Sequence, residues 1–435
     1  MTERSGFING CKLRFYEKIS QKLGSLPIFC HFCEVLNCSQ MLLNFTIGNY
    51  RSYREKMTFS MIASSIKEHD EYLYSDEVHA VLPTAVIYGA NSSGKSNLIE
   101  GFRAFLTTVL KSAVYSSVRE LDMYPFLYTA GYDKEPSYFE VELLIGDDEY
   151  RYGFTADRIS VREEWLYLTS AGRGREKCLF VRDGQSYNIT NHFKEARDLI
   201  DATKPNTLFL SVADAFNRST AKLIMRELSQ FVVFDGDKVK ELERYTQMAS
   251  VDDINVFLSQ FKLGFNRVDI PDRNNEIYKN VKALTSHNYY DENGQLLGER
   301  MVDMEGSESN GTNKLFDIAP LMITALATKS VIIIDELDCS LHPFITRYLI
   351  GLFNNPKTNP LRSQLIFATH DTNLLDKAFF RRDQIWFAEK NDIGATDLYS
   401  LVEFKEPGGT KVRNDRSYEK DYINGRYGAI PYLNV

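Results

Sequence analysis

A glycine-rich run at residues 89–96 is the part of the sequence whose residue types and spacing most clearly predict chemistry. It reads G-A-N-S-S-G-K-S and matches the pattern G-x-x-x-x-G-K-[ST] in full. In such a loop, backbone N–H groups converge on an anion, the lysine reaches the outer phosphates and the last hydroxyl ligates Mg²⁺. The run therefore predicts a phosphate-binding loop with Lys95 as the phosphate cation and Ser96 as a magnesium ligand. A glycine turn that matches by accident is the alternative.

The flanks of this run predict the elements that would position it. Residues 84–88 are a short apolar run that favours a strand, and residues 98–110 carry apolar side chains at helical spacing. The loop would thus join a strand to a helix N-terminus, where unpaired amides and the helix dipole favour a phosphate. The residues of this region predicted to bind the nucleotide are Gly89, Ala90, Asn91, Ser92, Ser93, Gly94, Lys95, Ser96 and Asn97.

Two carboxylates end a second apolar run. Residues 331–334 are Val-Ile-Ile-Ile, typical of a strand buried on both faces, and Asp335 and Glu336 follow directly. Ligands of open parallel sheets lie at the carboxyl ends of the strands, so these carboxylates are expected at the same edge as the phosphate loop. Asp335 would hold Mg²⁺, and Glu336 would orient or deprotonate an attacking water. A core strand followed by a solvated acidic turn is the alternative.

A third apolar run, residues 364–369, delivers His370 to the same predicted edge. A histidine there can hydrogen-bond a γ-phosphate during its transfer, which makes Lys95, Glu336 and His370 the predicted catalytic set. A purely structural histidine is the alternative. We assign no catalytic role to His342, which precedes Pro343.

A helix start lies just upstream of the Asp-Glu run. Ser309 can cap the N-terminus of a helix whose apolar residues continue to 326, and Gly311 allows a backbone to approach an anion. Alone, this is only a helix start. Its position before the carboxylates suggests a further contribution to the nucleotide site.

Composition limits the class of protein. The chain has 435 residues, 43% of them hydrophobic, and its 51 basic and 59 acidic residues give a net charge of -8. A chain of this length and composition can bury a large hydrophobic core. Its net negative charge does not provide the overall positive surface that is typical of nucleic-acid-binding proteins. No apolar run approaches the roughly 18 residues that span a bilayer, and no signal peptide is recognisable. We therefore expect a cytoplasmic protein without a membrane partner.

The first 40 residues hold four of the six cysteines. Cys30 and Cys33 have the C-x-x-C spacing of a zinc knuckle, but a second ligand pair at defined separation is missing, so reduced thiols are expected. Residues 1–40 are predicted to be an appendage, disordered or arising from a start codon placed too far upstream.

The rest of the chain divides by pattern into three parts. Residues 41–175 read as a β-rich lobe with the phosphate loop, residues 176–300 as a mainly helical insertion, and residues 301–435 as a second lobe. No heptad pattern persists long enough for a coiled coil. Strands are predicted at 43–47, 56–61, 137–145, 149–154 and 165–169, and a hairpin at 289–304.

The order of these motifs resembles the ATPase heads of the ABC/SMC superfamily, from Leu42 to the C-terminus. Within it the chain looks most like bacterial abortive-infection and phage-defence ATPases, the OLD-like, AbiL- and RloA-type group. The resemblance implies an α/β P-loop NTPase of ABC-ATPase type, with a mixed central sheet, an antiparallel β lobe and a helical insertion. The segments that carry it are 49–53, 309–312, 335–338, 340–343, 382–386 and 425–431.

The resemblance also implies an activity and partners. Two copies would close head to tail around ATP and Mg²⁺, with Ser309 and Gly311 completing the partner's site, and Arg51 would contact the nucleotide. The implied function is an ATP-hydrolysing switch that controls an operon-encoded effector such as a nuclease or toxin; DNA or a phage protein are further candidate partners. The chain departs from the pattern of this superfamily at two points. Its signature motif reads Ser-Asn-Gly-Thr instead of Ser-Gly-Gly-Gln. The usual glutamine of the Q-loop is missing, since no glutamine occurs between Ser96 and Gln185.

Three other functions compete with this one. A RecF- or SMC-like DNA-repair clamp would share the head, and a basic inner groove would favour it. A transporter subunit fits poorly because the insertion is long and the Q-loop glutamine is absent. A phosphotransferase is disfavoured because Glu336 and His370 suit water as the acceptor.

Overall fold

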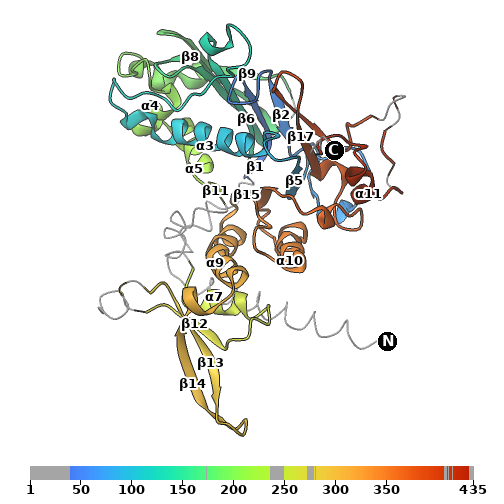
Figure 1. Ribbon diagram of the computed structural model, residues 1–435. Coiled ribbons are helices and arrows are strands. Elements are labelled where there is room, and N and C mark those ends of the chain that lie inside the picture. Colours follow the sequence, from blue (N-terminus) through green and yellow to red (C-terminus); the bar gives the residue numbers. More distant parts are fainter. Residues whose placement is uncertain are drawn as a thin grey trace. The chain divides into compact units, whose positions relative to one another are not determined.

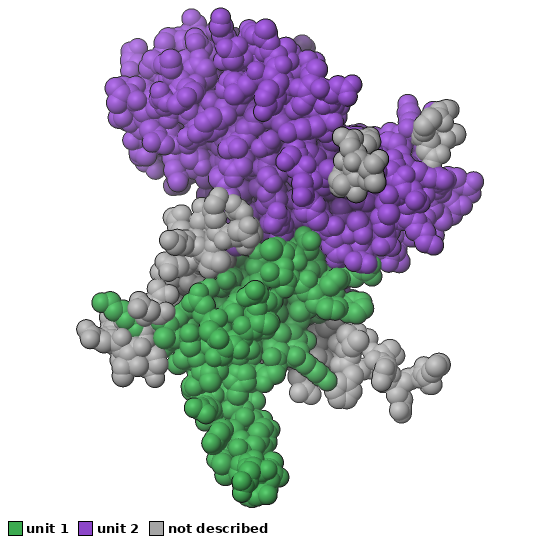
Figure 2. Space-filling model, in the orientation of Figure 1, with its two compact units in different colours: residues 1–37, 237–327, 338–349 green, residues 38–236, 328–337, 350–435 purple. Residues whose placement is uncertain are grey.

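The computed structural model describes most of the chain, in two compact units (Figure 2). Unit 1 contains residues 237–327 and 338–349, and unit 2 contains residues 38–236, 328–337 and 350–435. The described residues within them are 40–172, 174–235, 249–271, 279, 281–405, 409, 411–413 and 415–430. No helix in these ranges is both long enough and apolar enough to cross a membrane.

A seven-stranded antiparallel sheet forms one layer of unit 2 (Figure 1). Its order is β10-β9-β8-β7-β6-β1-β2, and alternating apolar residues such as Phe45 and Ile47 turn one face to the core. The strands are β1 (Gln40–Gly48), β2 (Met57–Ser60), β6 (Ser137–Ile145), β7 (Asp148–Ala156), β8 (Val161–Thr169), β9 (Lys177–Asp183) and β10 (Ser186–Ile189).

A six-stranded, mostly parallel sheet forms the second layer of unit 2. Its order is β11-β15-β16-β5-β17-β18, with only β18 antiparallel to its neighbour. Residues 331–334 are buried, as their continuous apolar run predicts. The strands are β5 (Thr84–Tyr88), β11 (Phe231–Asp235), β15 (Val331–Asp335), β16 (Gln364–Ala368), β17 (Ile385–Lys390) and β18 (Thr396–Ser400).

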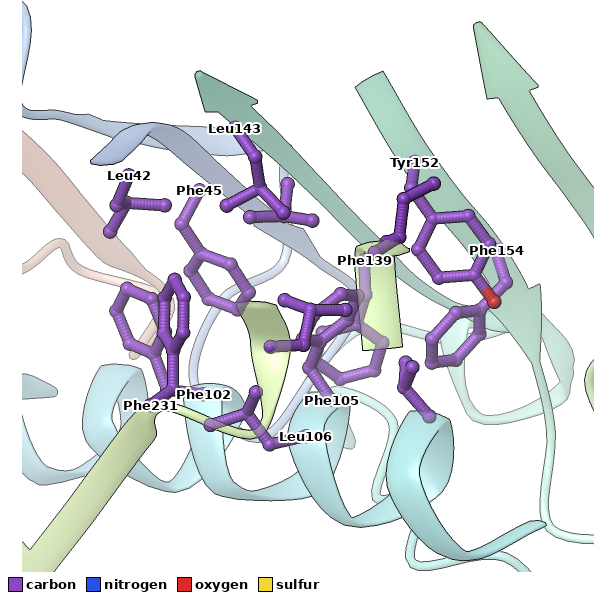
Figure 3. Packing of buried hydrophobic residues seen from close by; sticks show 14 of the residues in the cluster. Leu42, Phe45, Phe102, Phe105, Leu106, Phe139, Leu143, Tyr152, Phe154 and Phe231 are labelled. Carbon is purple, nitrogen blue, oxygen red and sulfur yellow. The ribbon is translucent and has the colours of Figure 1, made fainter. Parts of the chain in front are cut away.

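Helix α3 (Lys95–Lys111) packs between these sheets. Its apolar stripe meets β1, where Phe102 stacks on Phe45 with ring centroids 3.8 Å apart, and the aromatic cluster extends to Phe105 and Phe139 (Figure 3). The same helix contacts β11 and β15 of the parallel sheet. The core therefore fixes the helix whose N-terminus follows the phosphate loop.

Short elements complete unit 2. They are β3 (Tyr74–Ser75), β4 (Ala80–Val81), α4 (Phe209–Ala215), α5 (Ser219–Leu228), α11 (Tyr418–Ile423), and 3₁₀ helices at Asp70–Tyr72, Ser112–Val114, Tyr132–Lys134, Ser170–Gly172, Asn191–Leu199, Thr372–Leu374 and Arg382–Gln384.

Unit 1 combines helices with a small antiparallel sheet of order β12-β13-β14. Helix α9 begins in this unit, and α10 begins in it and ends in unit 2. Its elements are α7 (Val251–Leu258), β12 (Arg267–Asp269), β13 (Leu284–Tyr290), β14 (Leu296–Asp303), α8 (Met304–Ser307), α9 (Asn310–Thr328) and α10 (Pro343–Asn354).

The structure confirms the predicted α/β class with a mixed sheet and an antiparallel β lobe. The described residues of 176–300 do not form the one mainly helical insertion that the sequence predicted. Strands β9 and β10 extend the antiparallel sheet, and β11 forms an edge of the parallel sheet, so this stretch is divided between the two units. Residues 221–228 and 253–258 have a helical pattern and do lie in α5 and α7, and extending that pattern over the neighbouring strands is the error. Residues 1–39, with Cys30, Cys33 and the predicted appendage, lie outside the described residues.

A buried ion pair ties β8, β9 and α4 together. Glu164 and Arg182 have fully buried side chains 3.4 Å apart. The Glu164 carboxylate also accepts hydrogen bonds from the backbone N–H groups of Phe209 (2.6 Å) and Leu210 (2.9 Å), at the start of α4. Burial raises the pKa of Glu164, while Arg182 and the amides oppose that shift. The pair therefore couples the edge of the sheet to the helix that covers it.

We expect Glu164→Ala to lower the free energy of unfolding by about 3–5 kcal/mol, because it leaves the Arg182 charge buried without compensation. Glu163→Ala, at the exposed neighbouring position, should cost less than ~0.5 kcal/mol. Urea unfolding followed by tryptophan fluorescence measures both, since Trp165 and Trp386 lie in unit 2. Equal losses in the two variants would contradict this role of the pair.

Candidate functional site

The phosphate loop leaves β5 and enters α3 with its lysine folded inward. Lys95 is only 5% exposed, and its Nζ donates to the carbonyl oxygens of Gly89 (2.8 Å) and Ala90 (3.0 Å). Within the described part of the chain, the buried hydroxyl of Ser93 makes no hydrogen bond. The amides at the helix start, the Lys95 charge and this hydroxyl together fit a bound anion.

Two glycines of the loop lie where a side chain would not fit. A Cβ at Gly89 would come within 2.4 Å of the Ala388 carbonyl oxygen in β17. A Cβ at Gly94, whose φ is +115°, would come within 2.2 Å of the Thr396 hydroxyl in β18. The loop is thus pressed against the β17–β18 hairpin, and both glycines are required for that approach.

Side chains from two other segments, residues 52–53 and strand β18, hold the loop. The Thr396 hydroxyl donates to the Ser93 carbonyl oxygen (2.8 Å) and lies 2.7 Å from the Ser52 hydroxyl. The Tyr53 hydroxyl donates to the Gly94 carbonyl oxygen (3.2 Å), and burial raises the pKa of Tyr53, so it remains a neutral donor. The Asn97 amide donates to the Ser52 hydroxyl (2.7 Å). The loop is therefore held in position before any ligand arrives.

The predicted carboxylates and histidine reach the same sheet edge as the loop. In the parallel sheet, Ile334 pairs with Phe367, and Phe367 pairs with Val86. Asp335 and His370 therefore leave their strands at the edge where residue 89 follows β5. Strand β16 lies between β15 and β5, which separates Asp335 from the loop by roughly 10 Å of backbone spacing.

Glu336 has a left-handed backbone conformation, with φ at +51°. This conformation costs a non-glycine residue on the order of 1–2 kcal/mol, and such outliers cluster at functional sites. The N–H of Leu337 donates to the Ala368 carbonyl oxygen (3.3 Å), so the turn after β15 is fixed to the neighbouring strand. The turn holds Glu336 at the sheet edge.

Two cavities open on the phosphate loop. The smaller has a volume of about 240 Å³ and is lined by residues 92–97 and Lys390. The larger, of about 540 Å³, is lined by Gly89, Ala90, Asn91, Ser92, Ser93, His370, Thr372, Glu389, Lys390, Tyr422, Ala429 and Ile430. His370 thus faces a cavity that the loop shares, whereas Asp335 and Glu336 do not line either cavity.

Arg51 has a different environment from the loop residues. Its guanidinium lies 3.8 Å from Glu100 of α3 and 5.4 Å from the Tyr124 ring centroid, and it lines neither cavity. Its neighbours Ser52 and Tyr53 make the contacts with the loop. Arg51 as a nucleotide ligand stays a prediction.

Ser309 and Gly311 lie at the start of α9 in unit 1. The Ser309 hydroxyl accepts a hydrogen bond from the Thr312 N–H (3.2 Å), which is the predicted cap. A Cβ at Gly311 would lie 2.7 Å from the Ser340 carbonyl oxygen, so this glycine is needed for packing within unit 1. Their role toward a nucleotide stays a prediction.

The sequence did not predict Lys390, Thr396 or Tyr422 as site residues, and it marked residues 425–431 only as carrying the family resemblance. One signal was available for Lys390. It ends a strongly apolar strand, and such a strand, if parallel to β5, delivers its last residue to the loop edge. Thr396 carried no such signal because its role depends on a tertiary contact.

The donors suit magnesium. The Ser96 hydroxyl and the Asp335 carboxylate are hard oxygen donors, and Mg²⁺ at nucleotide sites uses few protein ligands together with phosphates and water. Among the described residues, no group of three or more histidines, cysteines or acidic residues could form a metal cage by itself. A cation shared with phosphates is the arrangement that this donor set fits.

A phosphate loop between a parallel β-strand and a helix, in one sheet with a strand that leads into Asp-Glu, defines a P-loop nucleoside triphosphatase fold. The model of the family described as "AAA domain, putative AbiEii toxin, Type IV TA system" matches residues 85–376. The match covers more than half of the chain, so this protein belongs to that family. The predicted relation to AAA proteins of abortive-infection systems is thereby confirmed.

Solved structures similar to this chain include the "SMC head domain from Thermotoga maritima", at 13% sequence identity and a TM-score of 0.39, covering 82% of this chain and 98% of that one. Another is titled "Crystal structure of the SmcHead bound to the C-winged helix domain of ScpA", at 13% identity and a TM-score of 0.38, covering 82% and 97%. No curated protein matches the sequence.

We expect Thr396→Val to weaken binding of a nucleoside triphosphate about tenfold, because it removes the hydrogen bond to the Ser93 carbonyl while keeping the side-chain volume beside Gly94. Thr58→Val is the matched control, since it removes an exposed Thr46–Thr58 hydrogen bond of 2.8 Å in the antiparallel sheet. Titration with a fluorescent nucleotide measures both. Unchanged affinity in Thr396→Val would show that the β18 contact does not organise the loop.

Proposed function

We propose that this protein binds Mg²⁺-ATP at residues 89–97 and hydrolyses it. The observation that carries the proposal is the convergence of the loop, the Asp335-Glu336 turn and His370 on one edge of the parallel sheet. A phosphate loop alone would suit any phosphoryl transfer. A carboxylate pair and a histidine beside it favour water as the acceptor.

Each side chain has a role that follows from its chemistry. Lys95, which donates to two loop carbonyls, would exchange them for β- and γ-phosphate oxygens when ATP binds. Ser96 and Asp335 would hold Mg²⁺, which neutralises developing charge on the phosphates. Glu336 would take the proton of the attacking water, and His370 would donate a hydrogen bond to the γ-phosphate.

Lys390 adds a second cation to the phosphate site. Its side chain lines both cavities and stands at the carboxyl end of β17, next to the strand that leads into the loop. A lysine in this position would offset the charge of a triphosphate more than that of a diphosphate. Lys390 would therefore favour ATP over ADP at this site.

The physiological role we propose is a switch in bacterial defence against phages. Two copies would close head to tail, with Ser309 and Gly311 of each copy completing the other's site, and closure would control a separate nuclease or toxin. The family description names a toxin of a toxin–antitoxin system, which supports a role in such a pathway. The net charge of -8 gives no support to a DNA-clamping alternative.

We expect Lys95→Ala to abolish ATP binding and Glu336→Gln to keep it while lowering hydrolysis by about 100-fold or more, because only the second residue acts on water. Glu71→Gln, the same change at an exposed position of unit 2, should match the wild type. Equilibrium ATP binding and phosphate release distinguish these outcomes. A Glu336→Gln protein that hydrolyses ATP at the wild-type rate would refute the assigned role.

The shared site can be tested by complementation. Gly311→Arg is unsuitable alone, because any side chain there meets the Ser340 carbonyl within unit 1. Asn310→Arg places the same charge and bulk at the exposed first residue of α9. Mixed with Lys95→Ala, it should form heterodimers with one intact composite site and recover up to about half the activity.

Two controls make that experiment decisive. Each variant alone should be inactive, and Asn310→Arg should still bind ATP as a monomer. Full activity of Asn310→Arg by itself would exclude a role of the α9 start in the partner's site. Verified heterodimers without any recovery would contradict independent composite sites.

A further inference from the structure

The C-terminal segment, defined here as residues 418–430, has no role in the function proposed above. It comprises α11 and the following loop, which includes the glycine-rich stretch that marked the family resemblance. Yet Tyr422, Ala429 and Ile430 line the larger cavity, opposite the first half of the phosphate loop and beside His370. A segment more than 320 residues away in sequence thus forms a wall of the candidate nucleotide site.

Specific contacts hold this segment on the β17–β18 hairpin. The Tyr399 hydroxyl of β18 donates to the Tyr427 carbonyl oxygen (2.6 Å). A Cβ at Gly428, whose φ is +69°, would come within 2.4 Å of Glu389 Oε2 and 2.9 Å of the Tyr399 hydroxyl oxygen. A side chain at position 428 would therefore displace Glu389 and Tyr399 and would also strain the left-handed backbone. The segment lies directly against the residue that precedes Lys390.

Aromatic contacts connect the segment to the strand that leads into the loop. The Tyr422 ring stacks on Phe387 of β17 with centroids 5.4 Å apart, and lies 5.8 Å from the ring of Tyr88, the residue before Gly89. The Tyr422 hydroxyl donates to the Ala429 carbonyl oxygen (3.0 Å). Burial raises the pKa of Tyr422 to about 12, so this hydroxyl stays a donor at neutral pH.

The segment also contacts the strand end that carries His370. The Tyr88 hydroxyl donates to the Asp371 carbonyl oxygen (3.1 Å), and α11 contacts the 3₁₀ helix at Thr372–Leu374. Displacing the segment would therefore disturb β17, β5 and the turn after β16 together. These are the elements that position Lys390, the loop and His370.

We propose that the C-terminal segment is part of the ATP site, with Ile430 lining the cavity in which the nucleotide binds, and that packing of the segment on β17 is required for high-affinity binding. This inference rests on the proposed ATP binding. Its apolar side chains exclude water from the side of the loop where His370 stands, which strengthens the electrostatic contacts made there. ATP binding and packing of the C-terminal segment on β17 should therefore favour each other.

The direct test compares a carboxylate at two positions of the same segment. Ile430→Glu would put a negative charge into the cavity and should weaken ATP binding at least about tenfold by repulsion. Ile423→Glu puts the same charge on the segment where the side chain is 58% exposed and lines no cavity, and it should change affinity less than about twofold. Equal affinities of the two variants would overturn the proposal.

The seating is tested by a second pair of variants. Gly428→Ala should weaken ATP binding about tenfold, because the methyl group meets Glu389 and Tyr399. Gly184→Ala introduces the same substitution at a φ of +55° with nothing within 4 Å, so it carries the backbone strain without the contact. Circular dichroism checks that both are folded, and wild-type affinity of a folded Gly428→Ala protein would refute the seating requirement.

ATP binding by the wild-type protein distinguishes failure of the proposed function from failure of the role given to the C-terminal segment. If it does not bind ATP, the proposed function itself fails, whatever the variants do. If it binds ATP and Ile430→Glu binds equally well, ATP binding stands and the role of the C-terminal segment is refuted.

Discussion

The parallel pairing of β15, β16, β5 and β17 is the constraint on which the candidate site depends. Because neighbouring parallel strands run in one direction, everything that follows their last residues meets at one edge, whatever the distance along the chain. Asp335, His370, the loop after β5 and Lys390 come from four distant stretches of sequence, and the register of this sheet brings them to that edge. A shift of one residue in any of these pairings would turn the terminal side chain to the opposite face. The buried apolar runs of these strands therefore determine the geometry of the site as much as its polar residues do.

Close backbone approach is the second requirement. Gly89 against Ala388, Gly94 against Thr396 and Gly428 against Glu389 are three contacts at which a β-carbon would collide with a neighbour, and all three involve the β17–β18 hairpin. The hairpin supports the phosphate loop on one side and the C-terminal segment on the other. It provides hydrogen bonds from Thr396, which is buried, and from Tyr399, which is half-buried, to carbonyl oxygens of the two segments. The positions of the phosphate loop and the C-terminal segment are consequently fixed by residues of the hairpin that need not touch a ligand.

Local patterns made the core of the site predictable, and tertiary contacts made the rest unpredictable. The phosphate loop, the Asp335-Glu336 turn and the Ser309 cap depend on residues close in sequence, and their placement follows from strand and helix periodicity. Lys390 and Thr396 acquire their roles only when β17 and β18 pair beside β5. Strands β9 and β10 were read as helical because the helical pattern of α5 and α7 was extended over them, and strands this short contain too few residues to show a clear period of their own. Strand β11 was missed although residues 231–234 form an apolar run, since its partner β15 lies about a hundred residues away.

The C-terminal segment gives the site a property that a self-contained loop would lack. If ATP binds only when the segment is seated, the apparent dissociation constant rises as the seated fraction falls, and a fraction of 0.01 would weaken binding roughly 100-fold. A partner that draws α11 away from β17 would then release the nucleotide without touching the phosphate loop. Reciprocity requires that ATP oppose that partner by the same factor. In the proposed switch, control by an effector would therefore need no contact with Lys95 or Glu336, because the hairpin that holds the loop also holds the segment.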